Sequence, residues 1–70
     1  MKEKLKKLRI SSALHHIEVK LRDFNFLLIQ QDFRIKNNYL KTYEVGKITE
    51  QNIFKEIREN LKLIEDYENK

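Results

Sequence analysis

Cysteine and proline are absent from this 70-residue chain, and glycine occurs once. Without cysteine the segment holds no disulfide, which suits a reducing compartment. The tight turns of a β-hairpin usually need glycine or proline, whereas the interior of a helix needs neither. The sequence therefore predicts a single all-α domain over residues 1–70, either a small helical bundle or a long helical hairpin, and we expect it to self-associate.

Long apolar runs are also absent. The longest unbroken run covers residues 26–29, far short of the roughly 20 residues that cross a bilayer. Mixed polar sequence follows the basic first residues, where a secretory signal would have an apolar segment. We therefore expect a cytoplasmic protein with no transmembrane segment. The many Lys, Ile, Asn and Glu residues favour a bacterial or phage source.

Groups that catalyse reactions or bind metals are scarce. The chain has no glycine-rich phosphate loop, and its only histidines are His15 and His16. His15 and Glu18 are three residues apart, but they could supply only two of the about four ligands of a zinc site. Ser11 and Ser12 lie near the histidines without a nucleophile elbow around them. The sequence therefore predicts no enzyme, no cofactor and no metal.

Apolar residues recur at steps of three and four, as on one face of a helix. The first stripe consists of Leu14, Ile17, Leu21, Phe24 and Leu28, extended by Ile10 and Ile35. Residues 30–32 and the pair Asn37 and Asn38 are the possible breaks, and Asp32 or Asn38 could cap a new helix. Residues 12–45 thus form one long helix, which would need a dimer to cover it, or two shorter helices that close a bundle within one chain.

Gly46 and Thr49 predict the start of the last helix. Gly46 suits the left-handed residue that ends a helix, and Thr49 suits the N-cap of the next one. Ile48 and Ile53 suit the hydrophobic staple around such a cap. We expect this helix over residues 50–67. Its apolar seam consists of Phe54, Ile57, Leu61 and Ile64.

Positive charge is concentrated at the N-terminus. Five basic residues against one acidic residue give the first nine residues a charge of +4, which equals the net charge of the chain. The basic residues are Lys2, Lys4, Lys6, Lys7 and Arg9. Such an arm, residues 1–10, suits contact with nucleic-acid phosphates or, through Leu5 and Leu8, with an anionic membrane. It equally suits a solvated first helical turn.

The chain has more apolar side chains than so small a domain can hide, since three Tyr and four Phe accompany its many Leu and Ile. Exposed apolar surface of this kind indicates an interface. The candidate interface residues are Phe24, Phe26, Leu27, Leu28, Phe54, Ile57 and Leu61. The sequence predicts a non-enzymatic protein–protein interaction module, an adaptor or inhibitor that binds a partner protein or a second copy. The alternative is a small nucleic-acid-binding regulator that uses the basic arm.

Residues 32–67 combine aromatic and aliphatic residues, a G-x-I-T sequence and an acidic amphipathic helix. The pattern is carried by Gly46, Ile48, Thr49, Ile53, Leu61 and Ile64. This segment resembles the C-terminal half of the bacterial effector-associated, death-like helical domains. It is also similar to SHOCT-type oligomerisation modules, with Phe54 as their aromatic residue. The resemblance implies a small helical adaptor that joins components of a defence system through like-with-like contacts.

Overall fold

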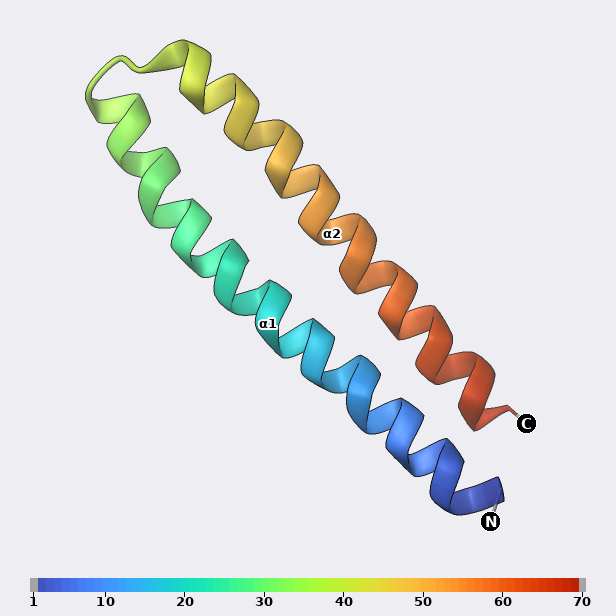
Figure 1. Cartoon of the computed structure of the whole chain (residues 1–70). Helices are drawn as coiled ribbons and strands as arrows, with labels where there is room; N and C mark the ends of the chain where they lie inside the picture. The colour runs from blue at the N-terminus through green and yellow to red at the C-terminus, as the bar shows by residue number, and fades with distance from the viewer. Residues whose placement is uncertain (1, 70) are drawn as a thin grey trace.

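The computed structural model describes residues 2–69, and two helices account for almost all of them. Helix α1 runs Lys2–Lys36 and helix α2 runs Leu40–Glu68. They lie side by side and antiparallel, joined by a short loop (Figure 1), in a rod of 54 × 15 × 11 Å. Residues 2–69 contain no strand. The predicted all-α helical hairpin is therefore confirmed.

The loop follows a regular helix-ending motif. Asn38 has a φ of 60°, in the left-handed region that asparagine adopts more readily than most residues. The backbone N–H of Asn38 donates to the carbonyl of Ile35 at 3.2 Å, and that of Tyr39 donates to the carbonyl of Arg34 at 2.8 Å. These two bonds form a Schellman motif, which satisfies carbonyls at the end of α1. The predicted break at Asn37 and Asn38 exists, but Asn38 ends α1 and does not cap the next helix.

The predicted boundary at Gly46 and Thr49 is wrong. Helix α2 runs through both residues without interruption, and Gly46 has no positive φ. The Thr49 hydroxyl donates to the carbonyl of Val45 at 3.4 Å, as mid-helix threonines do, and caps nothing. Ile48 is exposed and forms no staple. Helix α2 therefore starts well before the expected range of 50–67.

The other predicted boundaries also change. Residues 30–32 lie inside α1, where Asp32 pairs with Lys36 at 2.9 Å one turn later. Because α1 begins at Lys2, the basic residues belong to its first turns and do not form a separate arm. The range 12–45 is not one helix, since the loop at residues 37–39 interrupts it. The hairpin closes within one chain, although with two long helices rather than a bundle.

The contact between the helices follows a seven-residue repeat, whose inner positions we call a and d. On α1 these positions are Ile10, Ala13, Ile17, Lys20, Phe24, Leu27, Gln31 and Arg34, and on α2 they are Tyr43, Gly46, Glu50, Ile53, Ile57, Asn60, Ile64 and Tyr67. Every one of them is buried or half-buried. Steps of three and four keep one edge of each helix against the other. Leu14, Leu21, Leu28 and Ile35 of the predicted stripe fall on position e and are exposed.

The core of the hairpin is thin. Among the described residues the buried apolar side chains are Ala13, Leu27 and Ile53. The accessible surface is 6003 Å², whereas a compact monomer of 8.6 kDa exposes roughly 4,700 Å². The radius of gyration is 16.1 Å, against about 11 Å for a compact chain of this length. Each helix thus covers one edge of the other and leaves its remaining faces open.

Candidate functional site

The predicted interface residues divide between the core of the hairpin and its surface. The Phe24 and Phe54 rings pack across the two helices, with centroids 4.9 Å apart and planes tilted by 49°. Leu27 is only 5% exposed, and Ile57 is half-buried on the inner edge of α2. These four side chains hold the hairpin together, so most of their surface is used between α1 and α2; the half-buried Phe54 still presents part of its ring at position e.

The remaining three predicted interface residues lie on the surface. Phe26 is 62% exposed, Leu28 46% and Leu61 47%. They do not form one patch, because Leu28 and Leu61 occupy position e whereas Phe26 occupies position c, farther round α1. The exposed apolar residues therefore belong to two separate surfaces.

The two flanks of the hairpin differ in chemistry. In an antiparallel pair of helices, the g positions of both helices share one flank and the e positions share the other. Asp23 and Gln30, at position g of α1, line one hollow of about 390 Å³ together with Thr49 and Glu56, at position g of α2. The g flank is thus polar along the middle of the rod.

The e flank is apolar. We define the e face as Leu14, Leu21, Leu28 and Ile35 of α1 with Leu40, Lys47, Phe54 and Leu61 of α2. Apart from the half-buried Phe54, its apolar members are exposed. Lys47 is the one polar member, and its amine lies 4.9 Å from the centroid of the Tyr43 ring and 3.6 Å from the Glu44 carboxylate. Six of these eight residues belong to the predicted stripe and seam, and three of the six, Leu28, Phe54 and Leu61, were also predicted as interface residues.

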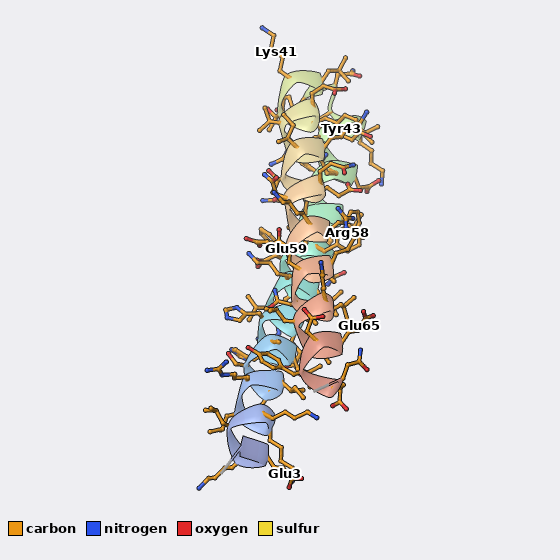
Figure 2. All side chains as sticks on the ribbon, turned by 90° about the vertical axis from the view of Figure 1, so that its right-hand side faces the viewer. Glu3, Lys41, Tyr43, Arg58, Glu59 and Glu65 are labelled. Atoms are coloured by element: carbon orange, nitrogen blue, oxygen red, sulfur yellow. The ribbon has the colours of Figure 1, made fainter. Side chains whose placement is uncertain are left out.

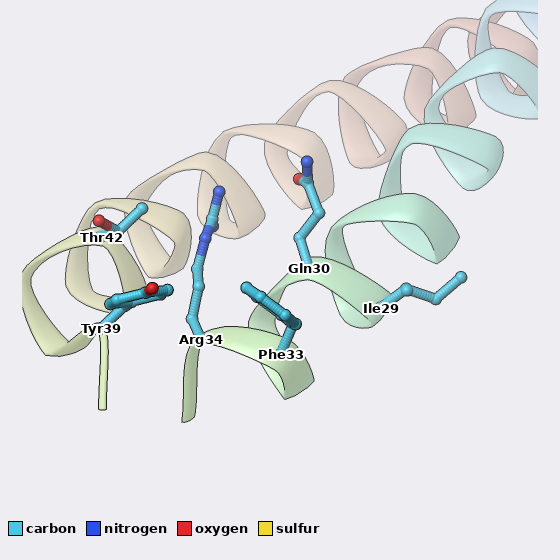
Figure 3. A pocket seen from close by; sticks show the side chains of 6 residues that line it. All are labelled: Ile29, Gln30, Phe33, Arg34, Tyr39 and Thr42. Atoms are coloured by element: carbon cyan, nitrogen blue, oxygen red, sulfur yellow. The ribbon is translucent and has the colours of Figure 1, made fainter. Parts of the chain in front are cut away.

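A second apolar surface lies on the outside of α1 near the loop. We define the outer patch as Phe26, Ile29, Phe33 and Tyr39, all of them exposed. The rings of Phe33 and Tyr39 are 6.0 Å apart. Figure 3 shows these two rings beside Arg34, in a hollow that Ile29, Gln30 and Thr42 also line. Three residues of this patch were not among the predicted interface residues, although their spacing of three and four along α1 could have found Ile29 and Phe33.

Polar side chains link the two helices near the loop, in the middle of the rod and, through Arg9 and Tyr67, near the open end. Near the loop, Gln31 is 6% exposed, donates from Nε2 to the Tyr43 carbonyl at 2.9 Å and accepts from Arg34 Nη1 at 2.7 Å. Its carboxamide lies against Gly46, where a Cβ atom would overlap it. Gly46 therefore allows the Gln31 side chain of α1 to approach the backbone of α2 closely, and it does not end a helix.

The link in the middle of the rod is an ion pair. Lys20 Nζ is 2.7 Å from a carboxylate oxygen of Glu56 and 3.9 Å from one of Asp23. The hydrogen bond to Glu56 is the main cause that raises the pKa of Lys20 above its ordinary value. Because both partners are partly solvated, the pair sets the alignment of the helices more than it stabilises them.

The predicted nucleic-acid residues lie at the open end of the rod, where α1 projects beyond α2 (Figure 1). Arg9 still contacts α2 near this end, since its guanidinium lies 5.8 Å from the Tyr67 ring centroid and its Nη1 lies 3.4 Å from the Tyr67 hydroxyl. Lys4 and Lys7 are exposed and Lys6 is half-exposed; the side chain of Lys2 lies outside the described part. Figure 2 shows Glu3 at this end and Lys41 at the other.

No group of three His, Asp or Glu side chains within the described residues is placed to hold a metal ion. Neither α1 nor α2, over residues 2–69, has a stretch long and apolar enough to cross a membrane. Comparisons of the chain with protein-family models, curated proteins and solved structures found no match. The resemblance of residues 32–67 to effector-associated or SHOCT-type domains therefore stays a prediction.

Proposed function

We propose that this protein is a non-enzymatic protein–protein interaction module, an adaptor or inhibitor that binds through apolar helix faces. The observation that supports the proposal is the contrast between three buried apolar residues and fifteen large exposed ones among those described. Contiguous exposed apolar surface marks interaction sites in soluble proteins. The absence of cysteine suits a cytoplasmic setting, and we place the module in a bacterial defence system or a phage.

The outer patch supplies the anchors for a partner protein. Phe26, Ile29 and Phe33 follow one another at i, i+3 and i+7 on α1. This is the spacing with which an amphipathic helix inserts into a hydrophobic groove. Tyr39 extends the row across the loop beside Phe33. Aromatic anchors of this kind carry much of the binding energy of an interface.

The test is site-specific photo-crosslinking in cells that express the protein. A photoreactive phenylalanine analogue at Phe26 should give an adduct of one discrete mass, and Phe33→Asp should abolish it. The same analogue at Lys55, an exposed residue of α2, is the matched control and should give no such adduct. Equal labelling from the two positions, or none from Phe26, would remove the proposal.

A second function, binding of nucleic acid, is favoured by the basic turns that project beyond α2. Lys4 and Lys6 lie there with no ion pair within the described residues. Contacts with phosphates would give an affinity for duplex DNA or RNA that falls with salt, with a slope of about −0.9 per contact. Lys4→Glu with Lys6→Glu should then abolish binding, whereas Lys55→Glu with Lys62→Glu should not. Undetectable binding at low salt excludes this function.

A further inference from the structure

The e face is arranged as a ladder. The register of the hairpin is set by contacts between Arg9 and Tyr67, between Phe24 and Phe54, and between Gln31 and Gly46. In this register the e residues of the two helices lie at the same levels. The rungs are Leu14 with Leu61, Leu21 with Phe54, Leu28 with Lys47, and Ile35 with Leu40. One further rung, Lys7 with Glu68, continues the ladder at the open end.

The width of the apolar stripe exceeds what a hairpin needs. Two helices that pack only on each other require apolar residues at a and d, whereas helices of a bundle also carry them at e or g. Seven of the eight positions of the e face are apolar. The g flank at the same levels has one apolar residue, Leu63, among His16, Asp23, Gln30, Thr42, Thr49, Glu56 and Leu63. The hairpin therefore has the pattern of one half of a four-helix bundle.

We propose that a second copy of this chain covers the e face, so that two hairpins form a four-helix bundle with twofold symmetry. This inference rests on the proposed function, because it names the occupant of one of the two apolar surfaces. A twofold interface needs a patch that complements itself. The e face does so, because each of its levels but one presents apolar side chains from both helices.

Charge decides how the second copy is oriented. With both loops at the same end, α1 of each copy faces α2 of the other, and Lys7 lies opposite Glu68 of the second copy. With the loops at opposite ends and the five rungs aligned, Lys7 and Glu68 would instead cover Ile35 and Leu40, which places unpaired charges on apolar surface. An alignment on the four apolar rungs alone would leave Lys7 and Glu68 beyond the loop of the second copy, without the opposite charges that the first arrangement provides. The loops therefore lie together.

Lys47 is compatible with this arrangement. It lies opposite Leu28 of the second copy, where its aliphatic stem can cover that side chain. Its amine stays at the edge beside Tyr43 and Glu44, where it already lies. Lysine commonly buries its stem in this way and keeps its charge in water.

The available area is sufficient for a stable dimer. From Lys7 to Ile35 the ladder is about 42 Å long at 1.5 Å per residue, and with the 15 Å width of the rod it covers about 630 Å² per copy. Two copies would bury about 1,260 Å², at the lower end of the range for stable interfaces. Burial of this area would also remove much of the surface by which the hairpin, at 6003 Å², exceeds a compact monomer of about 4,700 Å².

Sedimentation equilibrium on the purified full chain tests the dimer. The wild type should have twice its chain mass of 8.6 kDa. Leu21→Glu should raise the dissociation constant at least 100-fold. The matched control Ile29→Glu, on the outer patch, should not change it; Leu21 is 52% exposed and Ile29 63%. A monomeric wild type at about 100 μM, or equal dissociation of both variants, would overturn the inference.

A gain-of-affinity variant keeps the test valid if Leu21→Glu unfolds the hairpin. Lys47→Leu completes the ladder and should tighten the dimer about tenfold, the effect of about 1.4 kcal/mol. Lys55→Leu adds the same side chain on the polar side of α2 and should leave the dissociation constant unchanged. No tightening by Lys47→Leu, or the same tightening by Lys55→Leu, contradicts the proposed interface.

Spin labels test the orientation. Lys41 lies at the loop end (Figure 2) and is exposed. Because the chain has no cysteine of its own, Lys41→Cys provides a single site for the spin label. Loops at the same end place the two labels about 20–30 Å apart, since packed helices are about 10 Å apart. A separation close to the 54 Å length of the rod would overturn this orientation. Because crosslinking at Phe26 probes the outer patch, failure of the dimer and failure of the proposed function remain distinguishable.

Discussion

The carboxamide of Gln31 lies on the backbone of Gly46, in the space that a methyl group at position 46 would fill. Gln31 is buried, but its bonds to the Tyr43 carbonyl and to Arg34 satisfy it. No buried side-chain nitrogen or oxygen in the described part of the chain lacks a partner. The contact brings α1 and α2 together next to the loop, so it helps to set the register on which the e face depends.

Gly46→Ala should therefore have opposite effects in two backgrounds. In the wild type we expect it to lower the free energy of unfolding by about 1–3 kcal/mol, because the new methyl group displaces Gln31. In a Gln31→Ala background it should raise that free energy by about 1 kcal/mol, the difference in helix propensity between alanine and glycine. Urea unfolding followed by circular dichroism measures both. The same sign in both backgrounds would show that the contact with Gln31 does not explain the glycine.

The Phe24 and Phe54 rings should be energetically coupled. A double-mutant cycle with Phe24→Leu and Phe54→Leu keeps most of the buried area but loses the ring contact. We expect a coupling free energy of about 0.5–1.5 kcal/mol. Phe26→Leu, on the exposed outer patch, is the control and should change the free energy of unfolding of the isolated hairpin by less than about 0.5 kcal/mol. A coupling free energy near zero would mean that the two rings stabilise the hairpin only through the apolar area that each buries, and not through their mutual contact.

Asn38 should be sensitive to the shape of its substitute. Its φ of 60° suits glycine and penalises β-branched residues. We expect Asn38→Gly to keep or slightly raise the free energy of unfolding, and Asn38→Val to lower it by about 1–2 kcal/mol. Thermal unfolding of the two variants measures the difference. Equal melting temperatures would argue against the left-handed turn at residue 38.

Lys20 should make the hairpin sensitive to alkali. Its pKa is raised in the folded chain, chiefly by the hydrogen bond to Glu56, so its stabilising effect is complete below the ordinary lysine value of 10.5. The effect is lost as the pH rises through the higher folded value. The difference in urea midpoint between the wild type and Lys20→Met should therefore shrink above pH 10.5. A difference that instead shrinks on acidification from neutral pH down to pH 6 would contradict this assignment.

Local sequence rules failed at Gly46 and at Thr49 for one physical reason. A glycine followed by a threonine cap is a sound signal for a helix boundary when each helix is considered alone. Here the cost of a glycine inside a helix is offset by the approach of Gln31, which comes from the other helix. The sequence of α2 alone does not indicate that Gln31 packs against Gly46.

The candidate surfaces show the same limit. Phe26, Leu28 and Leu61 were predicted as interface residues and are exposed, but Leu27 was predicted with them and is buried. Adjacent residues such as Leu27 and Leu28 differ by about 100° around a helix. Whether each of them is buried or exposed therefore depends on the side on which the second helix packs, and the sequence of α1 alone does not specify that side.

The sequence by itself determined that this chain is helical and that its apolar residues outnumber what a small core can bury. The lack of proline, the single glycine and the steps of three and four are sufficient for both conclusions, because they act through local backbone geometry. Only the tertiary structure decided which flank of each stripe is covered. The predicted stripes used positions a and e, whereas the helices pack on a and d, with Lys20, Gln31 and Arg34 on the inner edge. These polar residues can lie there because Glu56 and the Tyr43 carbonyl on α2 accept hydrogen bonds from Lys20 and Gln31, and Arg34 donates to Gln31.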